Sequence, residues 1–271
     1  MAAWTVGLSR VSMTARPQKR ASRWGDQSMF PIYDSVTKHR VPIIVCSLIL
    51  LNALLFIYRL SLTEFDVIML FQSHGLLPYQ FFGGGSFPNG RPVTETWPLI
   101  TAAFLHWDWF HTIFNMWALW IFGATLEGGL GAGAFLILYL GCAVISSFTH
   151  GYFNPYSSSP MIGASGAIAG VIGAYTVLYP RARIALLIPI IIIPFIFRIR
   201  ALTFAAIWFS VQLFLGIHFL GSEWDVTTPA IGISVAWWAH IGGFIAGVLL
   251  VPFALLLRRP TMMEAPSADR A

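Results

Sequence analysis

Two side chains with the chemistry of a nucleophile and a base, Ser165 and His240, lie in strongly apolar parts of the sequence. A histidine that takes the proton of a serine hydroxyl converts the oxygen into a nucleophile for attack on a carbonyl carbon. His111 and Asn115 are four residues apart, so both project from one face of a helix. Their N–H groups are of the kind that stabilises the negative oxygen formed in such an attack. Together the four residues are compatible with acyl-transfer chemistry.

The sequence around Ser165 favours a position at the start of a helix. It reads Gly163-Ala164-Ser165-Gly166 and follows a polar stretch at 154–160. Unpaired backbone N–H groups and the positive end of the helix dipole would then lie beside the hydroxyl. Small residues recur along this segment and along the one that carries His240, which lets two helix backbones approach closely. They are Gly166, Gly170 and Gly173 in the first segment and Ala239, Gly243 and Gly247 in the second.

Each of these residues has an ordinary structural interpretation when it is taken alone. A serine among glycines most often only permits close packing, and His240 alone could be a hydrogen-bonded structural residue or part of a transport path. A metal site is not favoured by the spacing. His106 is five residues before His111, so it is rotated away from it on a helix, and the sequence has no His-Glu-x-x-His motif.

The composition indicates a membrane protein. Of the 271 residues 57% are hydrophobic and only 10% are charged, which is far from the usage of soluble domains. Six apolar stretches reach the roughly 17 to 25 residues needed to cross the hydrocarbon core. These are 42–60, 107–125, 132–148, 161–178, 202–220 and 231–257. A seventh apolar stretch, 184–197, is shorter and contains Pro189 and Pro194, so we interpret it as interfacial or re-entrant.

The basic residues predict the orientation, because Lys and Arg collect in cytoplasmic segments. With six spans both termini are cytoplasmic, and only Arg59 and Arg91 of the 16 basic residues fall outside. The sequence therefore predicts an all-α membrane protein, a six-transmembrane helix bundle. The net charge of +5 reflects this topology and attraction to anionic membrane lipids, and argues against nucleic acid as a partner. The expected parts are a disordered basic tail (1–40), the six-span domain (41–258) and a cytoplasmic tail (259–271).

This topology brings the candidate residues to one depth. The second, fourth and sixth predicted spans all run from outside to inside. His111, Ser165 and His240 lie in the first part of these spans, so at about 1.5 Å per residue they fall in the outer half of the membrane. The sequence therefore predicts a single polar cluster built from three parallel helices.

Three short motifs closely resemble those of the rhomboid family of intramembrane serine proteases, in the same order and in corresponding spans. The resemblance covers about 41–257, and it implies that Ser165 is the nucleophile and His240 the general base. Such a dyad lacks the carboxylate that usually orients the histidine, and Asp108 is not assigned that role. The motifs are His111-Thr-Ile-Phe-Asn115, Gly163-Ala164-Ser165-Gly166 and Ala239-His240-Ile241-Gly242.

The same resemblance implies an oxyanion hole made by the Ser165 backbone N–H, the His111 side chain and the Asn115 amide. No cofactor or metal is implied, and the substrates would be single-span membrane proteins with a small residue before the cut. In some members a tyrosine stacks on the histidine, and Ala169 stands at that position here. A Trp-Arg pair that some members carry in the first outer loop is also missing. The residues expected to support the site are His106, Gly163 and Gly166.

The sequence thus predicts an intramembrane serine endopeptidase that acts through an acyl-enzyme, in a bacterial inner (cell) membrane. One alternative is a catalytically inactive relative that binds and escorts membrane proteins. That alternative predicts loss of Ser165 or His240, and both residues are present. The other is a transporter or proton path through His111 and His240, which would favour paired carboxylates or helices broken near the midplane.

Overall fold

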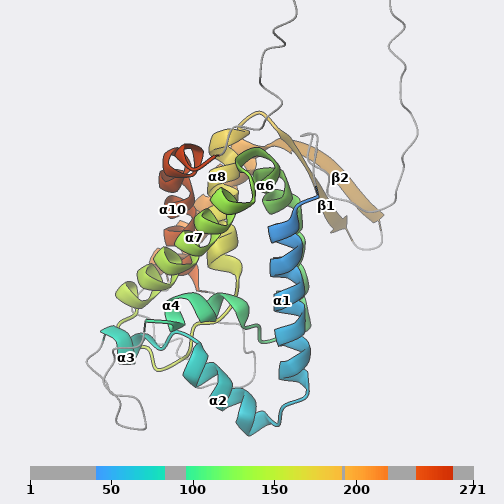
Figure 1. The fold of residues 1–271 in the computed structure, drawn as a ribbon. Coiled ribbons are helices and arrows are strands. Elements are labelled where there is room, and N and C mark those ends of the chain that lie inside the picture. Colours follow the sequence, from blue (N-terminus) through green and yellow to red (C-terminus); the bar gives the residue numbers. More distant parts are fainter. Residues whose placement is uncertain (1–40, 83–95, 191–192, 219–235, 259–271) are drawn as a thin grey trace, which may run out of the picture. The chain divides into compact units, whose positions relative to one another are not determined.

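The structure, a computed structural model, describes residues 41–82, 96–190, 193–218 and 236–258. The predicted terminal tails, 1–40 and 259–271, lie outside these residues. Most of the described chain is helical (Figure 1). The elements are α1 (Ile43–Leu60), α2 (Glu64–His74), α3 (Pro78–Phe82), α4 (Pro98–Thr101), η1 (Ala102–Phe104), α5 (Trp109–Ala118), η2 (Leu119–Gly123), α6 (Ala124–Leu130), α7 (Ala132–Phe153), α8 (Ser165–Leu178), β1 (Arg183–Ile190), β2 (Ile193–Arg200), α9 (Ala201–His218) and α10 (Trp237–Leu256).

Four of the described helices, α1, α7, α9 and α10, are long and apolar enough to cross a membrane. They coincide with four of the six predicted spans. The predicted fourth span is the shorter α8, of 14 residues. The predicted second span is divided into α5, the π-helical turn η2 and α6, which follow one another without a break. This last run ends at Gly131, whose φ of 87° is a conformation that favours glycine.

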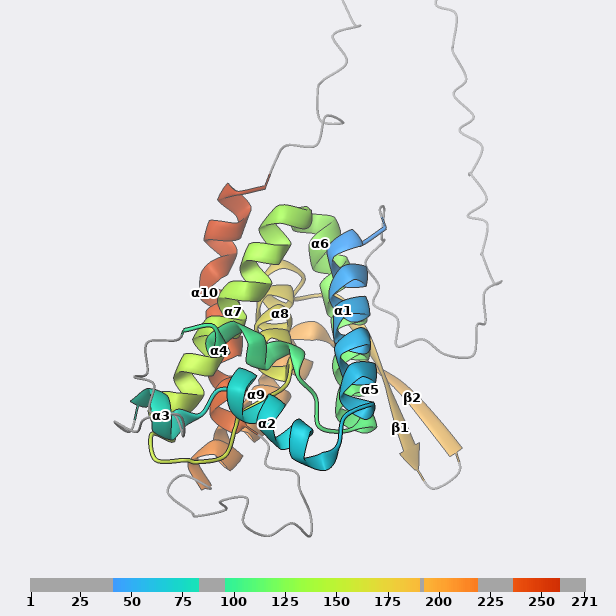
Figure 2. The same cartoon turned by 60° about the horizontal axis from the view of Figure 1, so that its bottom comes forward.

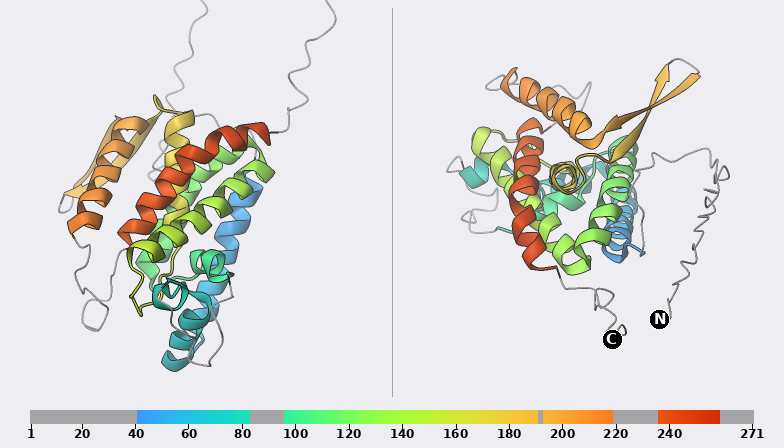
Figure 3. Two further views of the ribbon diagram at one scale, coloured as in Figure 1. Left: turned by 90° about the vertical axis from the view of Figure 1, so that its left-hand side faces the viewer. Right: turned by 90° about the horizontal axis from the view of Figure 1, so that it is seen from above.

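Helix α8 lies among the other long helices, and its burial reflects this position. In Figure 3 it is seen end-on with α7 and α10 close by. All residues from Gly166 to Thr176 are buried. Large side chains of neighbouring helices, including Phe135 and Tyr139 of α7, belong to the same hydrophobic core. The helix that begins with Ser165 is therefore held from several sides.

Helices α8 and α10 are in backbone contact, as the small residues predicted. A Cβ atom on Gly243 would overlap the carbonyl oxygen of Gly166, and one on Gly247 would overlap that of Gly170. Such proximity is possible only where side chains are absent. The predicted close approach of these two helices is confirmed.

The interfacial or re-entrant segment 184–197 is a β-hairpin, so the all-α prediction is wrong here. Strands β1 and β2 pair antiparallel from Arg183 opposite Arg200 to Ile190 opposite Ile193. The hairpin extends to one side of the helices (Figure 1). β-Branched and aromatic residues favour a strand, and the proline pair Pro189 and Pro194 would interrupt a helix. A two-stranded sheet tolerates proline because each strand has an open edge.

A buried carboxylate on α6 caps the start of α1. Glu127 accepts the backbone N–H of Ile44 at 3.0 Å and that of Val45 at 2.8 Å. The first N–H groups of a helix have no partner within the helix and carry partial positive charge, so an anion there is stabilising. Helix α1 also runs beside α5 (Figure 2), where the rings of Phe56 and Trp109 meet edge to face at 4.8 Å.

Candidate active site

Ser165 is the first residue of α8, as the sequence predicted. The preceding residue, Ala164, occupies the N-cap position and has no side chain that can accept the first N–H groups. Those N–H groups therefore remain available next to the Ser165 hydroxyl. This is the position in which backbone donors can stabilise an oxyanion.

The segment before Ser165 is held by backbone hydrogen bonds from two directions. Met161 exchanges a pair of hydrogen bonds with Leu76, at 2.7 and 3.0 Å. The Gly163 N–H donates to the carbonyl oxygen of Ala102 at 2.8 Å. Gly163 has φ of 122°, which L side chains rarely adopt. The loop that delivers Ser165 to the helix start is thus fixed in place.

His240 of α10 lies opposite Ser165. The Ser165 Oγ is 2.9 Å from His240 Nε2, a distance at which the hydroxyl donates a hydrogen bond to the ring. The His240 side chain is 9% exposed, while Ser165 is half-buried. A serine in contact with a largely buried imidazole is the arrangement needed to activate the hydroxyl by proton transfer.

The other ring nitrogen of His240 has a partner that sequence reasoning missed. His240 Nδ1 lies 2.7 Å from Oε1 of Gln212, a buried side chain of α9. The sequence held a signal for this residue, because an amide within a predicted span is costly unless it has a partner. Gln212 is uncharged and lies outside the three motifs, so neither charge nor motif marks it in the sequence.

His111 and Asn115 of α5 face the same region. Asp108 is the N-cap of α5, and its carboxylate accepts the His111 backbone N–H at 2.8 Å. The His111 ring lies against Gly163, because a Cβ atom on that glycine would be 2.6 Å from His111 Cε1. The glycine before Ser165 thus makes room for the imidazole, and the predicted cluster is present.

His106 is not rotated away from this cluster. The Asn115 side-chain N–H donates to His106 Nε2 at 3.0 Å, and the rings of His106 and His111 are 5.1 Å apart. The expectation assumed one continuous helix through both histidines. In the structure α5 begins only at Trp109, and His106 lies in the non-helical segment before it. This segment places the His106 ring beside Asn115 of α5.

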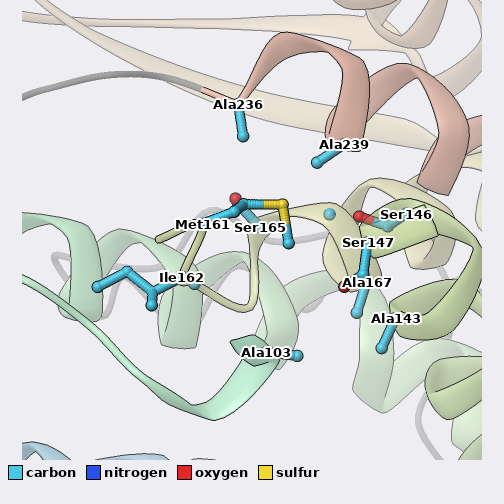
Figure 4. A pocket seen from close by; sticks show the side chains of 12 residues that line it. Ala103, Ala143, Ser146, Ser147, Met161, Ile162, Ser165, Ala167, Ala236 and Ala239 are labelled. Atoms are coloured by element: carbon cyan, nitrogen blue, oxygen red, sulfur yellow. The ribbon is translucent and has the colours of Figure 1, made fainter. Parts of the chain in front are cut away.

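A small cavity adjoins Ser165 (Figure 4). Its wall consists mainly of short side chains from α7, α8, α10 and the segment before Ser165. Ser146 and Ser147 of α7 contribute hydroxyl groups, and Ser146 Oγ lies where a Cβ atom on Gly166 would be. The lining residues are Ala103, Ala143, Ser146, Ser147, Met161, Ile162, Gly163, Ser165, Gly166, Ala167, Ala236 and Ala239.

Among the residues that the structure describes, no three His, Cys, Asp or Glu side chains lie close enough together to hold a metal ion. The described cysteines are both free thiols, with Cys46 exposed and Cys142 buried. The Cys142 sulfur lies against Gly170, so this residue fills space between α7 and α8. The described site residues offer a serine hydroxyl, histidine rings and side-chain amides.

Comparison with known proteins decides the family. The sequence profile of the Rhomboid domain matches residues 93–257, which include all the site residues described above. The chain belongs to the rhomboid family. It is therefore an integral membrane protein, and its long apolar helices agree with the membrane fold of that family.

Three relatives are similar to this rhomboid in sequence over part of their length. Rhomboid protein 1, mitochondrial, from Saccharomyces cerevisiae is 32% identical over 166 residues, which is 58% of this chain and 41% of the relative. Rhomboid protease GluP from Bacillus subtilis is 42% identical over 80 residues, or 30% of this chain and 15% of the relative. The putative rhomboid protease YdcA from the same bacterium is 38% identical over 85 residues, which is 30% of this chain and 40% of the relative. The rhomboid described here thus matches less than half the length of each relative.

Proposed function

We propose that this rhomboid is a serine endopeptidase that cleaves membrane-anchored proteins within the membrane. The observation that carries the proposal is the hydrogen bond of 2.9 Å between Ser165 Oγ and His240 Nε2. Two relatives are named as rhomboid proteases, which supports the same activity. A catalytically inactive escort would have no need for this contact.

The proposed reaction begins when His240 Nε2 takes the Ser165 proton while Oγ forms a bond to the scissile carbonyl carbon. The carbonyl oxygen then carries negative charge. His240 next gives the proton to the amide nitrogen, the C–N bond breaks, and the amine leaves an acyl-enzyme on Oγ. A water molecule attacks the ester carbon and gives a proton to His240, which returns it to Oγ as the acid product departs.

The oxyanion donors proposed are the Ser165 backbone N–H, the His111 ring and the Asn115 amide. The first lies at the uncapped start of α8. His111 lies against the loop before Ser165, and Asn115 is held by His106. Donors fixed before the reaction require no reorganisation when the charge develops, which is why such groups accelerate acyl transfer.

The substrates proposed are single-span membrane proteins with a small side chain before the scissile bond. The cavity beside Ser165 supports a small residue, since alanines, glycines and serines make most of its wall. An intact transmembrane helix keeps its peptide carbonyls in internal hydrogen bonds, so the substrate must unwind locally before attack. No cofactor is required by this scheme.

We further propose six membrane spans with both termini in the cytoplasm, counting the run α5–α6 and the short α8 as spans. The distribution of Lys and Arg supports this orientation. The bacterial cell membrane is the proposed location, supported by the two Bacillus subtilis relatives, although the yeast relative is named as mitochondrial. Reporter fusions after residues 60, 153 and 258 would test the orientation. We expect a cytoplasmic signal only from the fusion after residue 258, and an outside signal from the other two.

The decisive experiment is cleavage of a single-span reporter by the reconstituted protein and by Ser165→Ala. We expect cleavage by the wild type, none by the variant, and labelling of Ser165 by a fluorophosphonate. Thermal unfolding of both proteins controls for folding. No cleavage and no labelling of a folded wild-type protein would favour the escort function instead.

A further inference from the structure

Helix α9 has one buried polar side chain, that of Gln212. Of its 18 residues, only Ala201, Ala205, Gln212 and Gly216 are buried, and Gln212 alone among them is polar. Gln212 and Gly216 are four residues apart, so they lie on one face of the helix. An amide that is the one polar group on a buried helix face is costly unless it has a hydrogen-bond partner.

The partner of Gln212 is the ring of His240. Gln212 Oε1 lies 2.7 Å from His240 Nδ1, while Ser165 Oγ lies 2.9 Å from Nε2 on the opposite side of the ring. Both nitrogens of the imidazole are therefore in use. The residues come from three helices, with Ser165 on α8, Gln212 on α9 and His240 on α10.

The two contacts select one tautomer of the neutral imidazole. A neutral ring carries a proton on one nitrogen only, and the other nitrogen can accept. The Gln212 oxygen can only accept, so the proton belongs on Nδ1. His240 Nε2 is then the nitrogen that accepts from Ser165, as a general base must. The opposite tautomer would place a proton where the serine proton has to go.

Helix α9 also packs against His240 and its surroundings. The ring of Trp208 is 5.8 Å from the His240 ring, and Phe209 lies 4.9 Å from Phe244, one turn further along α10. Some rhomboids carry a tyrosine on the helix of the serine that stacks on the histidine. In this chain the corresponding residue of α8 is the buried Ala169, which has no aromatic ring. The aromatic packing against the imidazole on this side thus comes from α9, while α8 contributes the Ser165 hydroxyl.

We propose that Gln212 is the positioning residue of the catalytic base, holding His240 as the Nδ1–H tautomer with Nε2 directed at Ser165. This inference rests on the proposed serine protease function. Gln212 replaces the carboxylate of a triad by a neutral acceptor, which orients the ring without placing a charge inside the membrane. Because the acceptor comes from another helix, His240 is a competent base only while α9 lies against α10.

The test compares three variants of the full-length protein in lipid. Gln212→Met keeps the length of the side chain and removes the acceptor oxygen, whereas Gln212→Glu keeps an oxygen at the same reach. Ser210→Ala, on the exposed side of α9, is the matched control. For Gln212→Met we expect kcat to fall about 10- to 100-fold with KM unchanged, since general-base catalysis of this kind contributes roughly 10²- to 10⁴-fold. Gln212→Glu should recover most of the rate, and the control should behave as wild type.

A second measurement observes the tautomer without relying on turnover. The ¹⁵N shifts of His240, assigned by difference from His240→Ala, report which ring nitrogen carries the proton. We expect Nδ1–H in the wild type and an increased share of Nε2–H in Gln212→Met. An Nε2–H ring in the wild type would overturn the role of Gln212.

The two proposals fail in different ways. A wild-type protein that neither cleaves nor is labelled at Ser165 removes the protease function and the role of Gln212 with it. If the wild type cleaves and Gln212→Met has the same kcat, the protease function stands and Gln212 is only a packing residue. A folded Gln212→Met in which KM rises and kcat is unchanged would equally contradict a role in orienting the base.

Discussion

The side-chain amide of Asn115 donates to His106 Nε2 at 3.0 Å. An amide nitrogen has two N–H groups, so one holds the side chain in place and the other is left to bind a substrate oxygen. Both residues are buried, at 7% exposure for Asn115 and 2% for His106. The proposed oxyanion donor is thus fixed before a substrate arrives.

Replacing Asn115 should damage the reaction more than the fold. We expect Asn115→Ala to lower kcat by about 10²- to 10³-fold, the range for removal of one oxyanion donor. KM should change little, because the interaction is made chiefly in the transition state. Reporter cleavage by the reconstituted variant measures the effect, and thermal unfolding checks the fold. Wild-type turnover by Asn115→Ala would exclude this amide from the oxyanion hole.

His106 should act through Asn115 and not independently. His106→Ala is expected to lower kcat by up to about 10²-fold, since small misplacement of a catalytic group can have this effect. The double variant His106→Ala/Asn115→Ala should be no slower than Asn115→Ala alone, because the two residues form one unit. Losses that multiply in the double variant would show that His106 has a separate role.

The sequence predicted those parts of the site that follow from local pattern. Ser165 at a helix start follows from the glycines and the polar stretch before it. The approach of α8 to α10 follows from Gly243 and Gly247, because only small residues permit backbone contact. The grouping of His111 with Ser165 follows from parallel spans of similar depth. These are consequences of spacing and burial, which a sequence displays directly.

Two features that the sequence does not predict depend on contacts between distant segments. Gln212 is 28 residues from His240, and Glu127 is 82 residues from Val45, so no spacing rule links them. The hairpin was missed because an apolar segment too short to span a membrane can be helix, strand or re-entrant loop, and its periodicity does not decide between them. The position of His106 differs from the prediction because Asp108 is the N-cap at which α5 begins, so no single helix carries both His106 and His111.

The contact between Glu127 and the start of α1 should stabilise the fold. Glu127→Ala leaves the buried N–H of Val45 and the part-buried N–H of Ile44 without their acceptor, so we expect a loss of about 2 to 3 kcal/mol in the free energy of unfolding. Glu127→Gln, which keeps one oxygen, should lose less. The measurement is reversible unfolding in detergent, with the exposed Glu64→Ala as the control. Equal stability of Glu127→Ala and the control would contradict a capping role.

Close contact between α8 and α10 should be required both for stability and for the catalytic contact. Gly247→Ala places a methyl group where the Gly170 carbonyl lies, and backbone on both sides cannot move aside as a flexible side chain would. We expect a loss of about 1 to 3 kcal/mol, typical of an overpacked contact. Since α8 carries Ser165 and α10 carries His240, the helices should separate and cleavage should fall even where the variant remains folded.

Gly128→Ala on α6 is the matched control for Gly247→Ala, because nothing lies within 4 Å of a Cβ atom placed on Gly128. The control should keep full activity and wild-type stability or better, since alanine favours a helix more than glycine does. Normal stability and cleavage in Gly247→Ala would show that the two helices can approach without glycine at this position.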